Sequence, residues 1–413
     1  MKKTLLAAAL TVGFFGVAQA ETSVTLYGIL DGGIGYQQLK GVDSYATNRA
    51  GMTSMKAKKT GMINGIEYGN RWGLKGAEDL GNGLRAVFQL ESGFDLGTGQ
   101  QGQSSSSSNS DRLFGRQATL GLASDAWGQL DLGRQTNIAS KYLAGVATPF
   151  GASFGQANTG AVFTQANTAR YDNMVMYQTP NFSGFQFGVG YSFNVNGGES
   201  WKVDGTRNSN QHAITTGLRY GNGPIAVALT YDTFKARGKD AVAANAGTLN
   251  PVTGVYTPPR IASAATDDTT VKAWALAGSY DFEVVKLHAG FGQTRDGFFQ
   301  LQGYGGGSAA LSNATGAFGA AKGLKFNSYS LGLSAPLGNG KLMAGWMMAD
   351  PRSNPDSFAA GEDMDKQQTY SLGYTYGISK RTSLYAIGSY AKHVQFLPDA
   401  KSTLVGVGVV HKF

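Results

Sequence analysis

The sequence predicts an all-β protein: a closed antiparallel transmembrane β-barrel of 16 strands around an aqueous channel. Three observations predict this fold class. Apolar and polar residues alternate with a period of two, and the connections alternate between short and long. After the N-terminal 20 residues, no apolar stretch reaches the ~20 residues that a membrane-spanning helix needs. Glycine, at 60 of 413 residues, is about twice its usual frequency, which favours strands and turns.

The N-terminus has the features of a secretory signal peptide. Two lysines precede a short apolar run over residues 5–17, and Ala-Gln-Ala at residues 18–20 has the small-x-small pattern of a cleavage site. The apolar run is too short to cross a bilayer as a helix. We therefore expect residues 1–20 to be removed and residues 21–413 to form one barrel domain.

Strand segments are recognised by their two unlike faces. In residues 185–194, Phe, Val and Tyr share one face, and Gln, Gly, Ser and Asn share the other. Tyr and Phe at the ends of the apolar faces resemble the aromatic girdles of a membrane barrel, whereas a soluble sandwich is rich in Val, Ile and Leu inside. The predicted strands are 23–37, 67–78, 84–96, 112–124, 128–137, 169–179, 185–196, 211–221, 225–236, 270–280, 285–295, 326–337, 341–350, 367–378, 382–394 and 401–413.

The connections between these strands fit an up-and-down barrel with short periplasmic turns and long external loops. Short turns are expected at residues 79–83, 125–127, 180–184, 221–224, 281–284, 338–340 and 379–381. Long loops are expected at residues 39–66, 97–111, 138–168, 197–210, 237–268, 296–325, 351–366 and 395–400. The last strand ends in Phe413 and should pair with the first strand, which closes the barrel and removes both sheet edges.

Several short motifs together resemble the general diffusion porins of Gram-negative bacteria, of the β-proteobacterial type. They are VTLYG at 24–28, RWGLKG at 71–76, GRQA at 115–118, LGRQ at 132–135, PFG at 149–151 and the closing Phe413. The resemblance covers residues 21–413. It implies a homotrimer in the outer membrane whose third long loop folds into the lumen. It also implies that Arg71, Arg116 and Arg170 lie on the constriction wall opposite that loop, and that Arg134 lies at the subunit contact.

The loop over residues 138–168 has no secondary-structure signal of its own. A loop of this length is usually functional or disordered. It carries Pro149, Phe150 and Gly151, which we expect at the constriction. It contains no Asp or Glu, and its one charged residue is Lys141.

Lumen-facing residues can be chosen by alternation. Arg71 and Lys75 oppose Trp72 and Leu74, and an arginine facing lipid at mid-depth would cost about 2–4 kcal/mol, so these cations should point inward. The same reasoning adds residues from three further strands. The predicted constriction residues are Arg71, Lys75, Arg85, Glu91, Arg116, Lys141, Pro149, Phe150, Gly151, Arg170, Asp172 and Arg219.

Two arginines do not follow the alternation cleanly. Arg116 shares its side of the strand with Leu120 and Leu122, and Arg134 shares its side with Leu132, all of which look lipid- or interface-facing. For every arginine, a salt bridge that only stabilises the wall is the alternative role.

The function expected from these features is passive diffusion of small hydrophilic solutes and ions, with a preference for anions. The expected partners are further copies of the chain, outer-membrane lipid, lipopolysaccharide and small anions. Two alternatives stay open: a structural or adhesive barrel, and an outer-membrane barrel enzyme. The enzyme finds little support because the few histidines do not single out a catalytic base, so we expect no enzyme.

Other ligand classes find little support. The chain has no cysteine and only four scattered histidines, so no metal or cofactor site is expected. No basic run with interleaved aromatics suggests nucleic acid. The glycine-rich segment at residues 303–307 lacks the strand and helix of a phosphate loop. The acids at 267–268, 362–363 and 365 are expected to be solvated loop charges, with divalent-cation or lipopolysaccharide contact as the alternative.

Overall fold

The structure is a computed structural model that describes residues 23–42, 54–102, 112–202, 204, 210–238, 248–249, 256–257, 267–299, 319–356 and 364–413. The expected signal peptide, the glycine-rich segment at 303–307 and the acids at 362–363 lie outside these residues. No helix among the described residues is long and apolar enough to cross a membrane.

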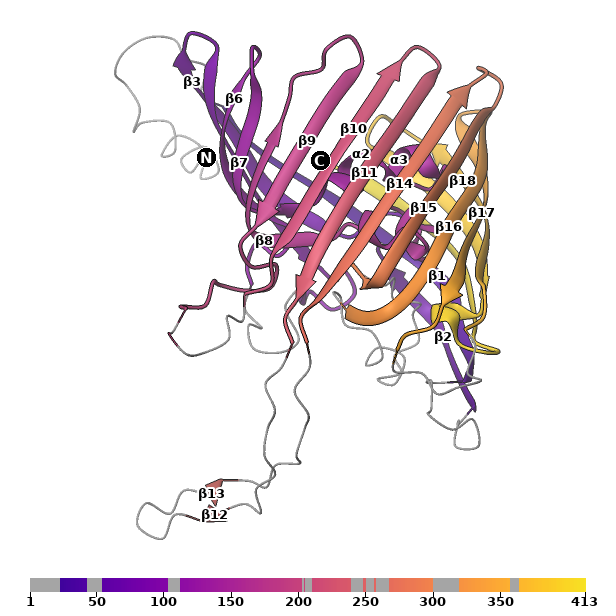
Figure 1. Cartoon of the computed structure of the whole chain (residues 1–413). Coiled ribbons are helices and arrows are strands. Elements are labelled where there is room, and N and C mark those ends of the chain that lie inside the picture. The colour runs from indigo at the N-terminus through magenta and orange to yellow at the C-terminus, as the bar shows by residue number, and fades with distance from the viewer. Residues whose placement is uncertain are drawn as a thin grey trace.

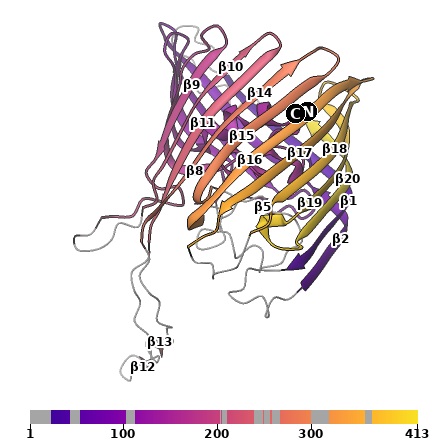
Figure 2. The same ribbon diagram turned by 45° about the vertical axis from the view of Figure 1, so that its right-hand side comes forward.

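One antiparallel sheet of 18 strands closes on itself (Figures 1 and 2). Two of its strands, β2 (Ser54–Asn64) and β5 (Gln101–Gly102), only extend the sheet at the end with the long connections. The remaining 16 form the barrel, and the predicted fold class is confirmed. They are β1 (Ser23–Val42), β3 (Arg71–Gly81), β4 (Leu84–Phe94), β6 (Gln117–Ser124), β7 (Gly128–Thr136), β8 (Arg170–Gln178), β9 (Phe185–Ser192), β10 (Ala213–Asn222), β11 (Ile225–Ala236), β14 (Thr269–Asp281), β15 (Lys286–Phe298), β16 (Gly319–Leu337), β17 (Gly340–Ser353), β18 (Gln367–Gly377), β19 (Thr382–Lys392) and β20 (Lys401–Lys412). A separate pair, β12 (Thr248–Leu249) and β13 (Tyr256–Thr257), lies in a long connection.

The barrel closes between its first and last strands. β1 pairs with β20 from Ile29 opposite Lys412 to Lys40 opposite Lys401. The N–H of Phe413 donates to the carbonyl of Gly28 at 3.1 Å, and the N–H of Gly28 donates back at 3.0 Å. This seam pairs the backbone groups that would otherwise be open edges.

The two faces of the wall differ as the alternation requires. Leu331 and Leu372 are each 58% exposed on the outside, whereas Ser330 and Ser371 on the other face are buried. Exposed leucines on this scale cover the outer wall, which suits contact with hydrocarbon.

The first long connection differs from the prediction. The loop expected over residues 39–66 contains the end of β1 and all of β2, and the strand expected to begin at residue 67 begins at Arg71. Residues 65–70 leave the sheet because the buried carboxylate of Asp31 binds their backbone. Its Oδ2 accepts from the N–H groups of Glu67 and Tyr68, each at 2.7 Å. Its Oδ1 accepts from the Tyr385 hydroxyl at 2.7 Å.

The connection between β7 and β8 also differs, because it is not irregular throughout. It forms two short α-helices and three 3-10 turns, and we call residues 137–169 the inner loop. Asn137 caps the first helix by accepting from the N–H of Ser140. The elements are α2 (Ile138–Tyr142), α3 (Ala144–Ala147), η2 (Gly155–Ala157), η3 (Thr159–Ala161) and η4 (Thr164–Ala166). Another 3-10 turn, η5 (Val394–Phe396), connects β19 to β20.

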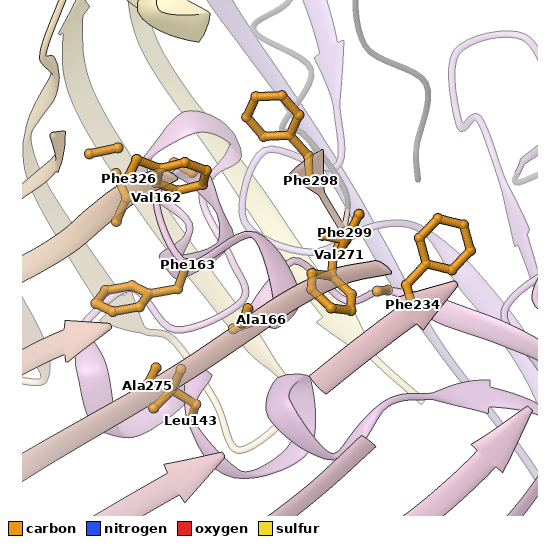
Figure 3. Packing of buried hydrophobic residues seen from close by; sticks show 14 of the residues in the cluster. Leu143, Val162, Phe163, Ala166, Phe234, Val271, Ala275, Phe298, Phe299 and Phe326 are labelled. Carbon is orange, nitrogen blue, oxygen red and sulfur yellow. The ribbon is translucent and has the colours of Figure 1, made fainter. Parts of the chain in front are cut away.

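The largest buried apolar cluster joins the inner loop to the wall (Figure 3). Leu143, Phe163 and Ala166 come from the loop, and Phe326 and Ala275 come from strands β16 and β14. Burial of these apolar side chains therefore attaches the loop to the barrel wall, in addition to the hydrogen bonds of the strands that the loop connects.

We predict that Asp31→Ala lowers the free energy of unfolding of the detergent-solubilised barrel by roughly 2–4 kcal/mol, because it leaves several buried donors without an acceptor. Tyr385→Phe removes one donor and should cost only about 1 kcal/mol. Urea unfolding followed by tryptophan fluorescence measures both. Equal effects of the two variants would contradict a central role for the carboxylate.

Candidate functional site

The inner loop is held by side chains on the side of the strands opposite the exposed apolar face. The hydroxyls of Ser328 and Ser330 donate to the carbonyls of Val162 at 2.7 Å and Ala147 at 2.9 Å. The amide of Gln367 donates to the carbonyl of Ala161 at 2.8 Å. The turns and short helices of the loop thus have their spare backbone acceptors satisfied by three different positions on β16 and β18.

Glycines on the same face give the loop's rings room. A Cβ on Gly332 would lie 2.4 Å from the Pro149 ring. The Phe150 ring lies against Gly345 and Gly373, where a Cβ would approach it to 3.1 and 3.0 Å. The predicted residues Pro149 and Phe150 therefore pack on strands β16 to β18, and Gly151 takes the left-handed conformation at φ +56°.

The tip of the loop reaches the segment that Asp31 holds. The rings of Phe150 and Phe154 meet edge to face at 5.7 Å, and those of Phe154 and Tyr385 meet at 5.9 Å. The N–H of Phe154 donates to the carbonyl of Glu67 at 3.3 Å. The loop is thereby fixed at both ends and at its tip.

An arginine cluster lies where β3, β4, β6, β7 and β8 begin or end. Arg116 Nε lies 2.6 Å from Glu91 Oε1, and the Tyr27 hydroxyl donates to Glu91 Oε2 at 3.0 Å. Arg71 and Arg170 both lie within electrostatic range of Arg116 and Glu91. The structure thus brings together the three arginines that the family resemblance places on one wall.

A second carboxylate in this region pairs with two further arginines. Asp172 Oδ1 lies 2.5 Å from Arg134 Nη1, and Asp172 Oδ2 lies 2.9 Å from Arg112 Nη2. The N–H of Gly197 also donates to Asp172, at 2.6 Å. Asp172 is thus fully used within the chain.

Arg71 and Arg170 differ from the other three arginines. Their guanidinium groups donate to the backbone carbonyls of Gly69 at 2.9 Å and Thr168 at 3.3 Å. Among the described residues, no Asp or Glu lies within ion-pair distance of either guanidinium. Five arginines against two acids leave a formal surplus of three positive charges in the cluster.

Simple alternation gives the wrong side for Arg116 only. Arg116 precedes the first residue of β6, so the alternation of that strand does not govern its direction. Arg134 keeps the side that it shares with Leu132, because the pairing of β7 with β6 is regular there and the extra residue of the shifted pairing lies on β8. Arg134 pairs with Asp172 from that side. The predicted subunit contact of Arg134 stays a prediction.

The remaining predicted residues are spread along the wall. Lys75 lies 5.5 Å from the centre of the Tyr27 ring, next to the cluster. Arg219 lies 4.8 Å above the Tyr142 ring of α2. Arg85 instead pairs with Asp125 at 2.7 Å in an exposed short turn, six residues or roughly 20 Å along β4 from Glu91.

Lys141 points from α2 back toward the wall. Its Nζ lies 3.1 Å from the side-chain oxygen of Gln135. Burial holds the pKa of Lys141 below its ordinary value, and the negative charge of Asp131 opposes this. The amine of Lys141 therefore lies between β7 and β8, close to Gln135 and Met176.

Sequence reasoning missed three residues of this region. Arg112 lies at the edge of a low-complexity loop, and Tyr27 and Asp31 belong to a strand chosen only for its alternation. An acid in the middle of an otherwise apolar and glycine-rich strand was the available signal for Asp31, because a buried carboxylate needs hydrogen-bonding partners.

No group of His, Asp or Glu among the described residues is arranged to hold a metal ion. Asp268 is used within the chain: it pairs with Arg237 at 2.7 Å and Lys235 at 3.4 Å. The N–H of Gly238, followed by Arg237, lowers the pKa of Asp268 to about 2. Asp365 lies 3.4 Å from His393.

Comparison with known proteins gives consistent matches. The family model described as Gram-negative porin matches residues 6–393. An outer membrane porin protein of Bordetella pertussis is 51% identical, and outer membrane porin protein 32 of Delftia acidovorans is 30% identical; both alignments cover 100% of each chain. An anion-selective porin from Comamonas acidovorans has a similar structure, with a TM-score of 0.62 and 25% identity over 95% of this chain and 100% of that chain.

These matches, with the closed barrel, confirm the expected multi-pass location in the outer membrane. Porins are channels rather than enzymes, so the expectation of no enzymatic activity is also confirmed. The protein is a member of the Gram-negative porin family.

Proposed function

We propose that the protein is a passive diffusion channel that prefers anions, and that Arg71 and Arg170 supply the preference. The observation that carries this proposal is that, in the part of the chain that the structure describes, neither guanidinium group has an acidic partner, while Arg112, Arg116 and Arg134 have one. The inner loop adds no Asp or Glu to offset them. The similar solved porin from Comamonas acidovorans is described as anion-selective, which supports the same assignment here.

The size of the effect follows from Coulomb's law. A unit charge about 10 Å away in water interacts by roughly 0.4 kcal/mol, so two unpaired arginines favour an anion by about 0.8 kcal/mol. That corresponds to about a fourfold gain in anion partition over a neutral solute, and salt reduces it. A preference of this size suits a general channel rather than a binding site.

The inner loop sets the width of this channel in our proposal. Its elements touch the inner sides of strands from β9 to β19, so its position controls how much of the barrel's section stays open. The resemblance to general porins further leads us to propose a homotrimer, in which Arg134 lies near the neighbouring subunit. Light scattering of the detergent-solubilised protein measures this assembly.

We predict that Arg71→Gln combined with Arg170→Gln reduces anion preference by about fourfold, because both unpaired cations are lost. Zero-current potentials in a KCl gradient across planar bilayers measure the preference. A matched control is Arg116→Gln with Glu91→Gln, which removes an ion pair without changing the net charge and should leave the preference nearly unchanged. Cation preference in the unmodified protein would refute the proposal.

We also predict that Gly332→Val raises single-channel conductance, because the new side chain displaces Pro149. Overpacking of this kind costs about 1–3 kcal/mol, enough to undock the tip of the loop for part of the time. Gly278→Val is the control, since a Cβ there meets only a backbone oxygen at 3.8 Å. Equal conductance in both variants would mean that the loop does not limit flow.

A structural or adhesive barrel is the remaining alternative. No current in planar bilayers from correctly folded protein would favour it over the channel.

A further inference from the structure

A small pocket lies between the tip of the inner loop and the barrel wall. Its volume is about 380 Å³, at the lower end of the range for small-molecule sites. Three parts of the chain line it: Glu67 and Tyr68 before β3, Phe150 and Phe154 of the inner loop, and the strands from β17 to β19. The residues that line it include no arginine of the cluster, so it is a separate site.

The backbone of Glu67 is fixed from two sides. Its N–H donates to Asp31 at 2.7 Å, and its carbonyl accepts from the N–H of Phe154 at 3.3 Å. The side chain is 7% exposed, and within the described part of the chain its Oε2 atom has no hydrogen-bond partner. Because buried carboxylates are normally hydrogen-bonded or paired, this oxygen is a site for a donor from outside the chain.

Lys341 of β17 lines the same pocket. It lies two residues before the buried Met343, so it shares the inner face of the strand. Among the described residues, no acid lies within ion-pair distance of Lys341, although Lys235 and Lys366 have acidic partners. Lys341 acts electrostatically on Glu67 without forming an ion pair with it. The pocket therefore presents one negative and one positive group that do not neutralise each other directly.

Neutral groups complete the lining. Hydroxyl groups come from Ser153, Thr375 and Ser383, and Thr375 lies directly opposite Lys341 in the sheet. Each hydroxyl can donate or accept a hydrogen bond, so these side chains suit a polar group beside either charge. The ring of Phe150 gives the pocket an apolar side.

We propose that the pocket binds a small zwitterion, an α-amino acid with an apolar side chain, whose ammonium lies on Glu67 and whose carboxylate lies on Lys341. A zwitterion supplies both missing partners at once, whereas a simple anion or cation leaves one of the two charges unpaired. The apolar side chain lies against Phe150. This inference rests on the proposed channel function, because the amino acid reaches the pocket from the lumen.

The charge of Glu67, which precedes β3 and lies outside the strands, depends on pH. Burial, followed by the negative charge of Asp31, raises the pKa of Glu67 to about 7, and the charges of Lys412 and Lys341 oppose this rise. The other titratable groups that face it are Tyr68 and Tyr385. Since the ammonium binds the ionised carboxylate, affinity for the amino acid should decrease as the pH falls below about 7.

The test titrates L-leucine into the detergent-solubilised protein and measures the dissociation constant by isothermal titration calorimetry. Glu67→Gln and Lys341→Gln should each weaken binding about tenfold, because each variant removes one charged partner. The matched control is Glu283→Gln with Lys286→Gln. It removes one acid and one lysine at the same end of the barrel that do not line the pocket, so binding should be unchanged.

Two analogues of leucine separate the classes of ligand. N-acetyl-leucine lacks the ammonium and leucinamide lacks the carboxylate, so each should bind about tenfold more weakly than leucine. If N-acetyl-leucine binds as well as leucine, the pocket is only an anion site, and if leucinamide does, it is only a cation site. Either result overturns the inference, as does unchanged leucine affinity in the Glu67 or the Lys341 variant.

Calorimetry and conductance distinguish failure of this inference from failure of the proposed function. Protein that conducts ions in planar bilayers but does not bind leucine overturns the inference and leaves the channel intact. Protein that binds leucine but carries no current refutes the channel instead. Conductance retained by each variant shows that a loss of leucine binding does not result from misfolding.

Discussion

Closure of the sheet is the constraint on which the other features depend. An unpaired backbone group in hydrocarbon costs several kcal/mol, so β1 must pair with β20, and the seam runs its full length to the bonds between Gly28 and Phe413. A barrel of 16 strands is too wide for side chains alone to fill. Polar side chains of the strands, such as Ser328 and Ser330, are therefore free to bind the loop over residues 137–169.

The inner face and the loop have matching chemistry. Small residues such as Gly332 and Ser330 let loop atoms approach the wall and supply donors to loop carbonyls. Contact with lipid is unfavourable for a face made of these small residues. The same residues therefore keep that face of the strand away from lipid and leave room for the loop. This explains why the polar faces are poor in large side chains.

Alternation was sufficient to predict the barrel, because each strand has one lipid-facing side and the period of two follows directly. It failed where the chain leaves the regular ladder. Arg116 lies outside its strand, and residues 65–70 are held out of the sheet by hydrogen bonds to Asp31. Each departure depends on a contact between distant segments that no local pattern encodes. Ion pairing also depends on contacts between distant segments. Alternation predicts that Arg71 faces inward, but it does not predict that Glu91 pairs with Arg116 while Arg71 binds a backbone carbonyl.

Arginines that pair with an acid within the chain can be distinguished from those that do not, and we assign a structural role to the first group only. A buried carboxylate that lacks a partner is costly, so Glu91 and Asp172 each recruit arginines and fix the junctions of β4, β6, β7 and β8. Once Glu91 and Asp172 have arginine partners, further arginines in the cluster add charge repulsion and do not stabilise the fold. Stability alone therefore does not explain why the chain has them. Among the described residues, Arg71 and Arg170 share this property. We propose that an anion from solution is the partner of these two guanidinium groups.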